Sequence, residues 1–168
     1  MKHYILTIFI LLVDLAFSQI DPKNIDIVRD QYGVPHIFAP TDAEVAYGLA
    51  WAHAEDDFKT IQQSYLAGNN QLSKSIGNAG LGADFIAQFI GSEALYNKLY
   101  ENEISLAYKK VIEGYKQGIN RYAATHPEEL LVEGFFPITT KEMIRYAQLQ
   151  LFISSKGDQW VQRIVNND

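Results

Sequence analysis

The sequence predicts a mainly α-helical fold that begins with a short β element, and three observations carry this prediction. Apolar and polar residues alternate near residue 25, two long segments carry apolar residues at helical spacing, and two Thr-x-x-Glu motifs mark helix starts. Of the 168 residues, 48% are hydrophobic and 12% are aromatic. Such a chain has enough apolar surface to bury and to form one folded domain.

The β element consists of two short predicted strands. Alternation begins at Ile25, residues 31–33 (Gln-Tyr-Gly) are typical of a turn, and residues 34–38 supply the second strand, which Pro40 ends. Pro35 lies inside that second strand. Because proline cannot donate to a sheet ladder, we expect an edge or a bulge there.

A long helix is predicted from Thr41 to Gly68. Thr41 or Asp42 caps it, Glu44 stands three residues after Thr41 as a capping box requires, and the glycine ends it. Its apolar stripe comprises Val45, Leu49, Ala52, Phe58, Ile61 and Tyr65. A loop is expected over residues 77–85, followed by a short helix over residues 85–90.

The clearest helix is predicted over residues 103–124, with Pro127 beyond its end. One face carries apolar residues at spacings of three, four and seven: Tyr108, Val111, Ile112, Tyr115, Ile119 and Tyr122. Thr139 and Glu142 form the capping box of a last helix that reaches about Ile153.

The first 18 residues are typical of a secretory signal peptide. Lys2 and His3 make a basic start, residues 4–13 form an apolar run, and residues 16–18 resemble a cleavage site. The apolar run is too short to span a bilayer. We therefore expect a periplasmic or secreted protein without a membrane span, whose single mature domain covers residues 19–168.

Composition excludes several classes of site and partner. The formal charge is −6 and no Lys/Arg cluster follows one face, so nucleic acid is not an expected partner. The chain has no cysteine, which excludes disulfides, thiolate metal sites and a cysteine nucleophile. No Gly-x-Ser-x-Gly turn presents a serine.

The polar residues leave alternatives open. His53, Asp56 and Asp57 share one side of the predicted helix and would suit either a metal ion or a solvated, ion-paired surface. His36 is either a hydrogen-bonded core residue or a base. Gly91-Ser92 is a bond of the kind that self-cleaves in enzymes with an N-terminal nucleophile, but cutting it would divide the chain before its best helix. The residues by themselves specify no active site.

Two motifs together resemble the N-terminal signature of the penicillin acylase family of N-terminal-nucleophile hydrolases. They are Arg-Asp-x-Tyr-Gly-Val-Pro-His-Ile at residues 29–37, and Tyr-Gly-Leu-Ala with Ala-His-Ala-Glu-Asp at residues 47–56. The resemblance extends from about Ile25 to Ile153. Asp57 stands where penicillin-cleaving members often carry arginine, which makes the chain more similar to the branch acting on acyl-homoserine lactones and on aculeacin-type lipopeptides.

The resemblance implies the α-chain portion of an αββα heterodimer. In this family an exported precursor cuts itself into a small α chain and a large β chain, and the β chain begins with the catalytic serine. The amine of that serine acts as the base. No catalytic residue is then expected in this chain, which is incomplete and inactive without its β chain. The implied substrates are small acyl amides: acyl-homoserine lactones, acyl peptides or β-lactams.

The resemblance also places an acyl pocket and a calcium ligand. The pocket positions fall on Leu149, Phe152 and Ile153, where penicillin-type enzymes have Met, Arg and Phe; the three are equally compatible with core positions of the last helix. The calcium carboxylate falls on Gln159. A side-chain amide is a weaker calcium ligand than a carboxylate. A structural calcium is therefore expected only if the alignment shifts by one residue, so that Asp158 takes this position. No cofactor is implied for the chemistry.

A second reading is a non-catalytic exported helical protein that reuses this scaffold for binding or assembly, or a truncated remnant. The two readings differ in their surfaces. An α chain should expose apolar side chains on its strands and outer helix faces when its partner is removed, whereas a self-sufficient module should not.

Overall fold

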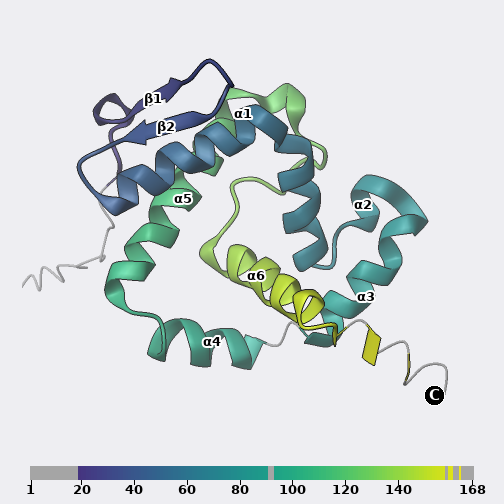
Figure 1. Ribbon diagram of the computed structural model, residues 1–168. Coiled ribbons are helices and arrows are strands. Elements are labelled where there is room, and N and C mark those ends of the chain that lie inside the picture. Colours follow the sequence, from purple (N-terminus) through teal and green to yellow (C-terminus); the bar gives the residue numbers. More distant parts are fainter. Residues whose placement is uncertain (1–18, 91–92, 158, 161–162, 164–168) are drawn as a thin grey trace, which may run out of the picture.

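The computed structural model describes residues 19–90, 93–157, 159–160 and 163, and shows a mostly helical chain with one small sheet (Figure 1). The predicted signal peptide and Gly91-Ser92 lie outside these residues. The strands are β1 (Asp26–Arg29) and β2 (Pro35–Phe38). The helices are α1 (Asp42–Gly68), α2 (Ser73–Ile76), α3 (Leu81–Ile90), α4 (Glu93–Asn102), α5 (Leu106–Thr125) and α6 (Thr140–Ser154), with 3-10 turns η1 (Pro22–Asn24), η2 (Gly77–Gly80) and η3 (Pro127–Glu129).

The mainly helical prediction with an initial β element is confirmed. No helix within the described ranges combines the length and the apolar character needed to cross a membrane.

The two strands form an antiparallel hairpin that lies against the first half of α1 (Figure 1). Gly33 adopts a φ of +81° in the connecting turn, a conformation that glycine tolerates best. Pro35 is the first residue of β2, a strand position that accepts proline. The hairpin packs closely over Gly48, where an added Cβ would lie 2.7 Å from the Ile37 side chain. Glycine at this position lets the hairpin sit directly on α1.

Helix α1 consists of two segments joined by a kink at Asp57, whose φ of −160° and ψ of 72° are not helical. Thr41 caps the first segment, because its hydroxyl oxygen accepts a hydrogen bond from the Glu44 N–H at 3.3 Å. The Glu44 carboxylate accepts from the Thr41 hydroxyl at 2.7 Å instead of from the backbone, a variant of the expected capping box. The predicted apolar stripe is right at Ala52, Phe58 and Tyr65, which are buried, and wrong at Val45, which is exposed.

Close packing against α5 explains that difference. A Cβ at Gly114 of α5 would collide with the carbonyl oxygen of Ala43, and a Cβ at Gly118 would collide with the carbonyl oxygen of Tyr47. The two glycines are one turn apart on α5, so they form a groove that receives the backbone of α1. Small residues of α1 therefore face inward at this crossing, and the larger Val45 faces outward.

The predicted face of α5 is partly confirmed. Ile112, Ile119 and Tyr122 are buried, but Tyr108 is exposed near the start of the helix. Ser105 caps α5 by accepting a hydrogen bond from the Tyr108 N–H, so the helix begins later than expected.

The loop predicted over residues 77–85 is wrong, because α3 already begins at Leu81, and α4 was not expected at all. A contact across this region explains the early start of α3. The Asp84 carboxylate accepts hydrogen bonds from the N–H groups of Leu72 at 2.7 Å and Ser73 at 3.0 Å. Gly80 is buried against Ser73. Tertiary contacts thus stabilise helical turns in a glycine-rich segment whose own propensity disfavours them.

The core lies between α1, α5 and the segment that precedes α6. Its buried members include Phe58, Leu66, Ile119, Tyr122, Phe135 and Ile138. Two amides tie the intervening segment to the helices: Gln62 binds the Glu129 carbonyl oxygen and the Leu131 N–H, each at 2.9 Å, and Asn120 binds both backbone groups of Ile138 at 2.8 Å. These contacts set where α6 begins.

Candidate functional site

Helix α6 carries the three residues that the sequence predicts to line an acyl pocket. The predicted capping box is present, since the Glu142 carboxylate accepts from the Thr139 N–H at 2.6 Å and the Thr139 side chain accepts from the Glu142 N–H. Leu149 is 4% exposed, Phe152 is half-buried and Ile153 is 45% exposed. Positions three and four apart share a helix face, so these side chains form one apolar strip that runs from the core to the surface. Gly157 lies so close to the Phe152 ring that a Cβ added at this glycine would collide with it.

The polar side chains behind this strip are incompletely paired. The Gln148 side-chain amide is buried, and within the described part of the chain both its nitrogen and its oxygen lack a hydrogen-bond partner. The Arg145 Nε atom is in the same state. Buried polar atoms are normally paired. These three atoms are exceptions to that rule within the described residues.

The residues predicted to hold calcium remain a prediction. Gln159 is exposed, and Asp158 lies outside the described residues. Across the described ranges, no three His, Asp or Glu side chains come close enough together to hold a metal ion.

Arg29 joins the two sequence motifs. Its Nη2 atom lies 2.8 Å from the Asp56 carboxylate and 3.2 Å from the Glu55 carboxylate, and it donates to the Ala52 carbonyl oxygen at 3.4 Å. Its Nη1 atom donates to the Gly33 carbonyl oxygen at 2.8 Å. The hydrogen bonds and charges of Asp56 and Glu55 raise the pKa of this arginine.

Arg29 thus links the hairpin to α1 immediately before the kink. This role of Arg29 was not predicted from the sequence. The available signal was the opposite charge of Arg29 and Glu55-Asp56 in two motifs that occur together.

The helical cluster considered for a metal ion does not assemble as one. Asp56 is paired with Arg29, and the His53 Nδ1 atom lies 3.2 Å from the Tyr115 hydroxyl. The Asp57 carboxylate accepts from the Thr60 N–H at 3.0 Å and so caps the second segment of α1. Hydrogen bonds from the Thr60 side chain and from its backbone lower the pKa of Asp57. Each side chain therefore has a structural partner, and the kink at Asp57 breaks the regular spacing on which the metal reading rested.

His36 is an exposed residue of the hairpin rather than a core histidine. Its Nε2 atom lies 3.4 Å from the Asp30 carboxylate. The other oxygen of Asp30 accepts hydrogen bonds from the N–H groups of Tyr32 at 2.8 Å and Val34 at 3.0 Å. These backbone hydrogen bonds, with a smaller contribution from His36, lower the pKa of Asp30 below its ordinary value of 3.8.

Replacing Asp30 by Asn should therefore lower stability in a pH-dependent way. A carboxyl group with a lowered pKa stabilises the fold above its ordinary pKa, and it loses that contribution as the pH falls through the folded value. We expect the unfolding midpoints of wild type and Asp30→Asn to differ most above about pH 5 and to converge well below pH 3.8. Thermal unfolding between pH 3 and pH 7 measures this, and a difference that does not change with pH would contradict it.

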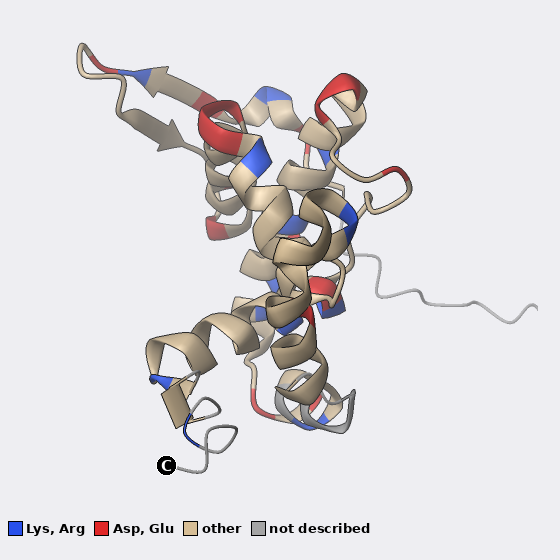
Figure 2. Cartoon of the chain, turned by 90° about the vertical axis from the view of Figure 1, so that its right-hand side faces the viewer, with Lys and Arg blue, Asp and Glu red and all other residues tan. Residues whose placement is uncertain are grey.

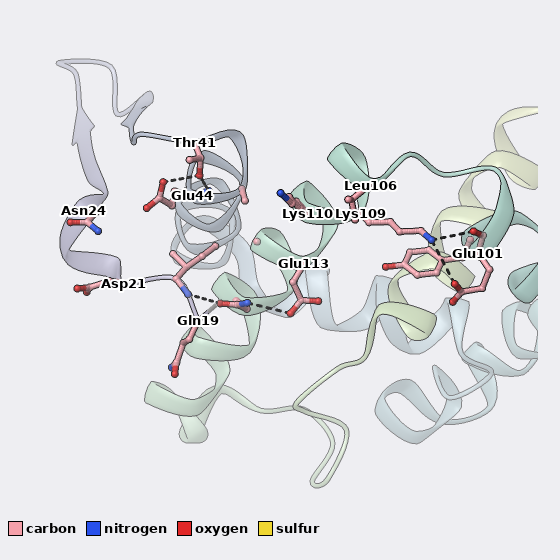
Figure 3. Close-up of a pocket in the computed structure, with 15 residues that line it drawn as sticks. Gln19, Asp21, Asn24, Thr41, Glu44, Glu101, Leu106, Lys109, Lys110 and Glu113 are labelled. Carbon is pink, nitrogen blue, oxygen red and sulfur yellow. Dashed lines mark hydrogen bonds and ion pairs between the residues drawn. The ribbon is translucent and has the colours of Figure 1, made fainter. Parts of the chain in front are cut away.

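An open cleft of about 970 Å³ lies between the N-terminal segment, α1 and α5 (Figure 3). The Ile20 N–H donates to the Gln117 side chain at 2.9 Å, which ties the N-terminal segment to α5. On the far side, Lys109 lies 3.6 Å from the Glu101 carboxylate and over the Tyr100 ring. The described residues that line it include neither serine nor histidine, and the Thr41 hydroxyl is bound to Glu44. This cleft thus offers no nucleophile paired with a base.

Large apolar side chains are exposed on several elements, and the hairpin and α3 each carry three or more of them. On the hairpin and its turn they are Val28, Tyr32, Val34 and Phe38, and on α3 they are Leu81, Phe85 and Phe89. The acidic and basic residues, by contrast, are interspersed over the helices and the hairpin (Figure 2). Exposed apolar clusters of this kind mark surfaces that contact another molecule.

Comparisons with known proteins agree with the motifs. Residues 24–157 match the penicillin amidase family. The chain is 23% identical over 155 residues to the acyl-homoserine lactone acylase PvdQ of Pseudomonas fluorescens, an alignment that covers 84% of this chain and 20% of that protein. It is 23% identical over 151 residues to penicillin G acylase of Escherichia coli, covering 86% and 18%. The chain thus spans about a fifth of the length of the curated relatives it matches.

Among solved structures, the thermostable penicillin G acylase from Alcaligenes faecalis matches with a TM-score of 0.63 and 19% identity. The alignment covers 82% of this chain and 74% of the matched chain. At this identity the likeness shows the fold alone.

Proposed function

This chain belongs to the penicillin amidase family, and we propose that it is the α-chain portion of an exported acylase whose catalytic serine begins a larger β chain. The serine hydroxyl would attack the carbonyl carbon of a substrate amide while the serine's own α-amine takes the proton. The protonated α-amine would pass that proton to the amine part of the substrate as it leaves, and water would then release the acyl group from the serine as a carboxylic acid. Acyl-homoserine lactones, acyl peptides and β-lactams are the proposed substrates.

The main support for this proposal is how much of each relative's length aligns with this chain. The chain aligns with only 20% of PvdQ but with 74% of the solved acylase chain. That difference is expected when a long precursor is divided into a short chain and a long chain. The exposed apolar side chains of the hairpin and α3 favour the same reading over a self-sufficient binding module.

Co-production of both parts tests the proposal. The reading frame would be extended through the DNA that follows the Asp168 codon, and acid release would be measured from an N-acyl-homoserine lactone and from penicillin G. We expect hydrolysis only when residues 19–168 and a chain beginning with serine are both present. A stable monomer of residues 19–168 with a cooperative thermal transition and no such partner would instead favour the non-catalytic alternative.

We further propose that α6 supplies one wall of the acyl pocket. Leu149 anchors the wall in the core, while Phe152 and Ile153 would present apolar surface to an aliphatic or aromatic acyl group. The arginine found at the position of Phe152 in penicillin-type relatives would make that wall polar. The apolar wall instead favours acyl groups that gain free energy by burial.

Replacing Phe152 by Ala should therefore lower kcat/KM for a long-chain acyl amide about 10-fold or more, because a buried aromatic side chain contributes roughly 1.5–3 kcal/mol. Leu151→Ala is the matched control, since Leu151 is 71% exposed and lies on another face of the same helix. The ratio of kcat/KM between long and short acyl chains is the measurement. If this ratio is equal in wild type and Phe152→Ala, Phe152 does not line the acyl pocket.

Export and calcium complete the proposal. Signal removal would leave a chain that starts near Gln19 or Ile20, which N-terminal sequencing of the secreted or periplasmic protein reads directly. A calcium ion would be held by Asp158 or by the Gln159 side chain, and its other ligands would come from the β chain, because the described residues of this chain supply no group of three. Calorimetric titration of the assembled protein with calcium tests for that ion.

A further inference from the structure

Helix α3 is apolar on two faces. Ala87 is buried against the rest of the chain, and Ile86 and Ile90 are half-buried beside it. On the outer side, Leu81, Phe85 and Phe89 are 55%, 64% and 74% exposed. These three residues are spaced by four, so they form one continuous line along the helix, which we call the α3 stripe.

The polar residues of α3 are already engaged elsewhere. Asp84 is the only charged residue in the helix sequence, and its carboxylate turns back to bind the N–H groups that start α2. The Gln88 side chain accepts a hydrogen bond from the Asn70 amide. The stripe is therefore left without charge. A helix that is apolar on opposite faces is normally buried on both.

We propose that the α3 stripe is a docking surface for the nucleophile-bearing β chain and is covered in the assembled acylase. This inference rests on the proposed function. Most of the length of the PvdQ and penicillin G acylase relatives lies outside the part that this chain matches, so a large partner is available. Helix α3 also packs on α6, so a partner that completes the predicted acyl wall reaches α3 as well (Figure 1).

A second copy of this chain is a poorer occupant. Two stripes meeting face to face would bury three side chains from each copy, and even aromatic side chains cover only about 150–250 Å² each. A stable interface buries about 800 Å² on each partner. The stripe alone falls short of that area, whereas a large partner chain can cover the stripe together with neighbouring surface.

Cysteine labelling tests the inference, because the natural chain has no cysteine. Phe85→Cys and Phe89→Cys are made separately in the full chain, alone and co-produced with the β chain, and the rate of reaction with a fluorescent maleimide is measured. Both wild-type side chains are largely exposed, so the substitutions leave the core intact. Glu128→Cys, on the exposed turn η3, is the matched control.

We expect the β chain to slow labelling at residues 85 and 89 at least 10-fold, with no comparable change at residue 128. Equal rates in a complex that hydrolyses acyl amides would overturn this inference and leave the proposed function standing. Protection that appears in the isolated chain and grows with its concentration would identify a second copy as the occupant and would also overturn it. If no active complex forms, the proposed function and this inference fail together.

Discussion

Replacing Gly118 by Ala should destabilise the protein by about 3 kcal/mol, the upper end of what overpacking costs. The added methyl group would collide with the carbonyl oxygen of Tyr47. That oxygen belongs to the backbone of α1, so it cannot move away as a flexible side chain would. Because a domain of this size is stable by only about 5–15 kcal/mol, the loss would be a large fraction of the total.

The same substitution at Gly82 is the control. An added Cβ at Gly82 meets no atom within 4 Å, and the residue lies inside α3. Alanine is a better helix former than glycine, so Gly82→Ala should be neutral or stabilising by up to about 1 kcal/mol. Urea unfolding followed by circular dichroism measures both variants. Similar stabilities for the two would show that α5 is free to move away from α1.

Replacing Gln62 by Leu should also destabilise the protein by about 3 kcal/mol. The Gln62 side chain is 2% exposed and binds the Glu129 carbonyl oxygen and the Leu131 N–H. Leucine has a similar size but can bind neither group. Two backbone groups would then be left unpaired in a part-buried setting, and each such group costs about 1–3 kcal/mol.

Gln63→Leu is the matched control, because it removes the same amide from the adjacent, half-buried position. We expect that variant to change stability by no more than about 0.5 kcal/mol, as is usual away from the core. Hydrogen exchange at Leu131 gives an independent measurement, since its N–H should exchange faster in Gln62→Leu alone. Unchanged exchange at Leu131 would mean that the segment is held by other contacts.

The elements that local sequence predicted well are those with strong local signals. The hairpin has a turn built from Asp30 and Gly33, and α6 has a complete capping box at Thr139. Both signals act over three or four residues. The first turn of α3, which was missed, lies in a glycine-rich segment that is held by contacts such as that of Asp84 with Leu72. Helix α4 was missed as well.

The candidate site likewise combines features that could be predicted from the sequence with features that only tertiary contacts reveal. The two motifs led to the family. The acyl wall at Leu149, Phe152 and Ile153 remains a prediction from that resemblance, because the spacing of these positions is equally compatible with core residues. The structure showed instead that Arg29 is a clamp for the hairpin, and that His53, Asp56 and Asp57 each have a separate structural partner.

The helical class, the initial hairpin and the family could be predicted from the sequence, because capping motifs, apolar spacing and a specific motif pair are all local properties of the chain. The small residues that meet at the α1–α5 crossing, the position of the bend in α1 and the apolar faces that remain uncovered became evident only in the folded chain. These features depend on contacts between residues far apart in the chain. Whether Phe85 is core or surface, for example, depends on what packs against α3, and no local pattern records that.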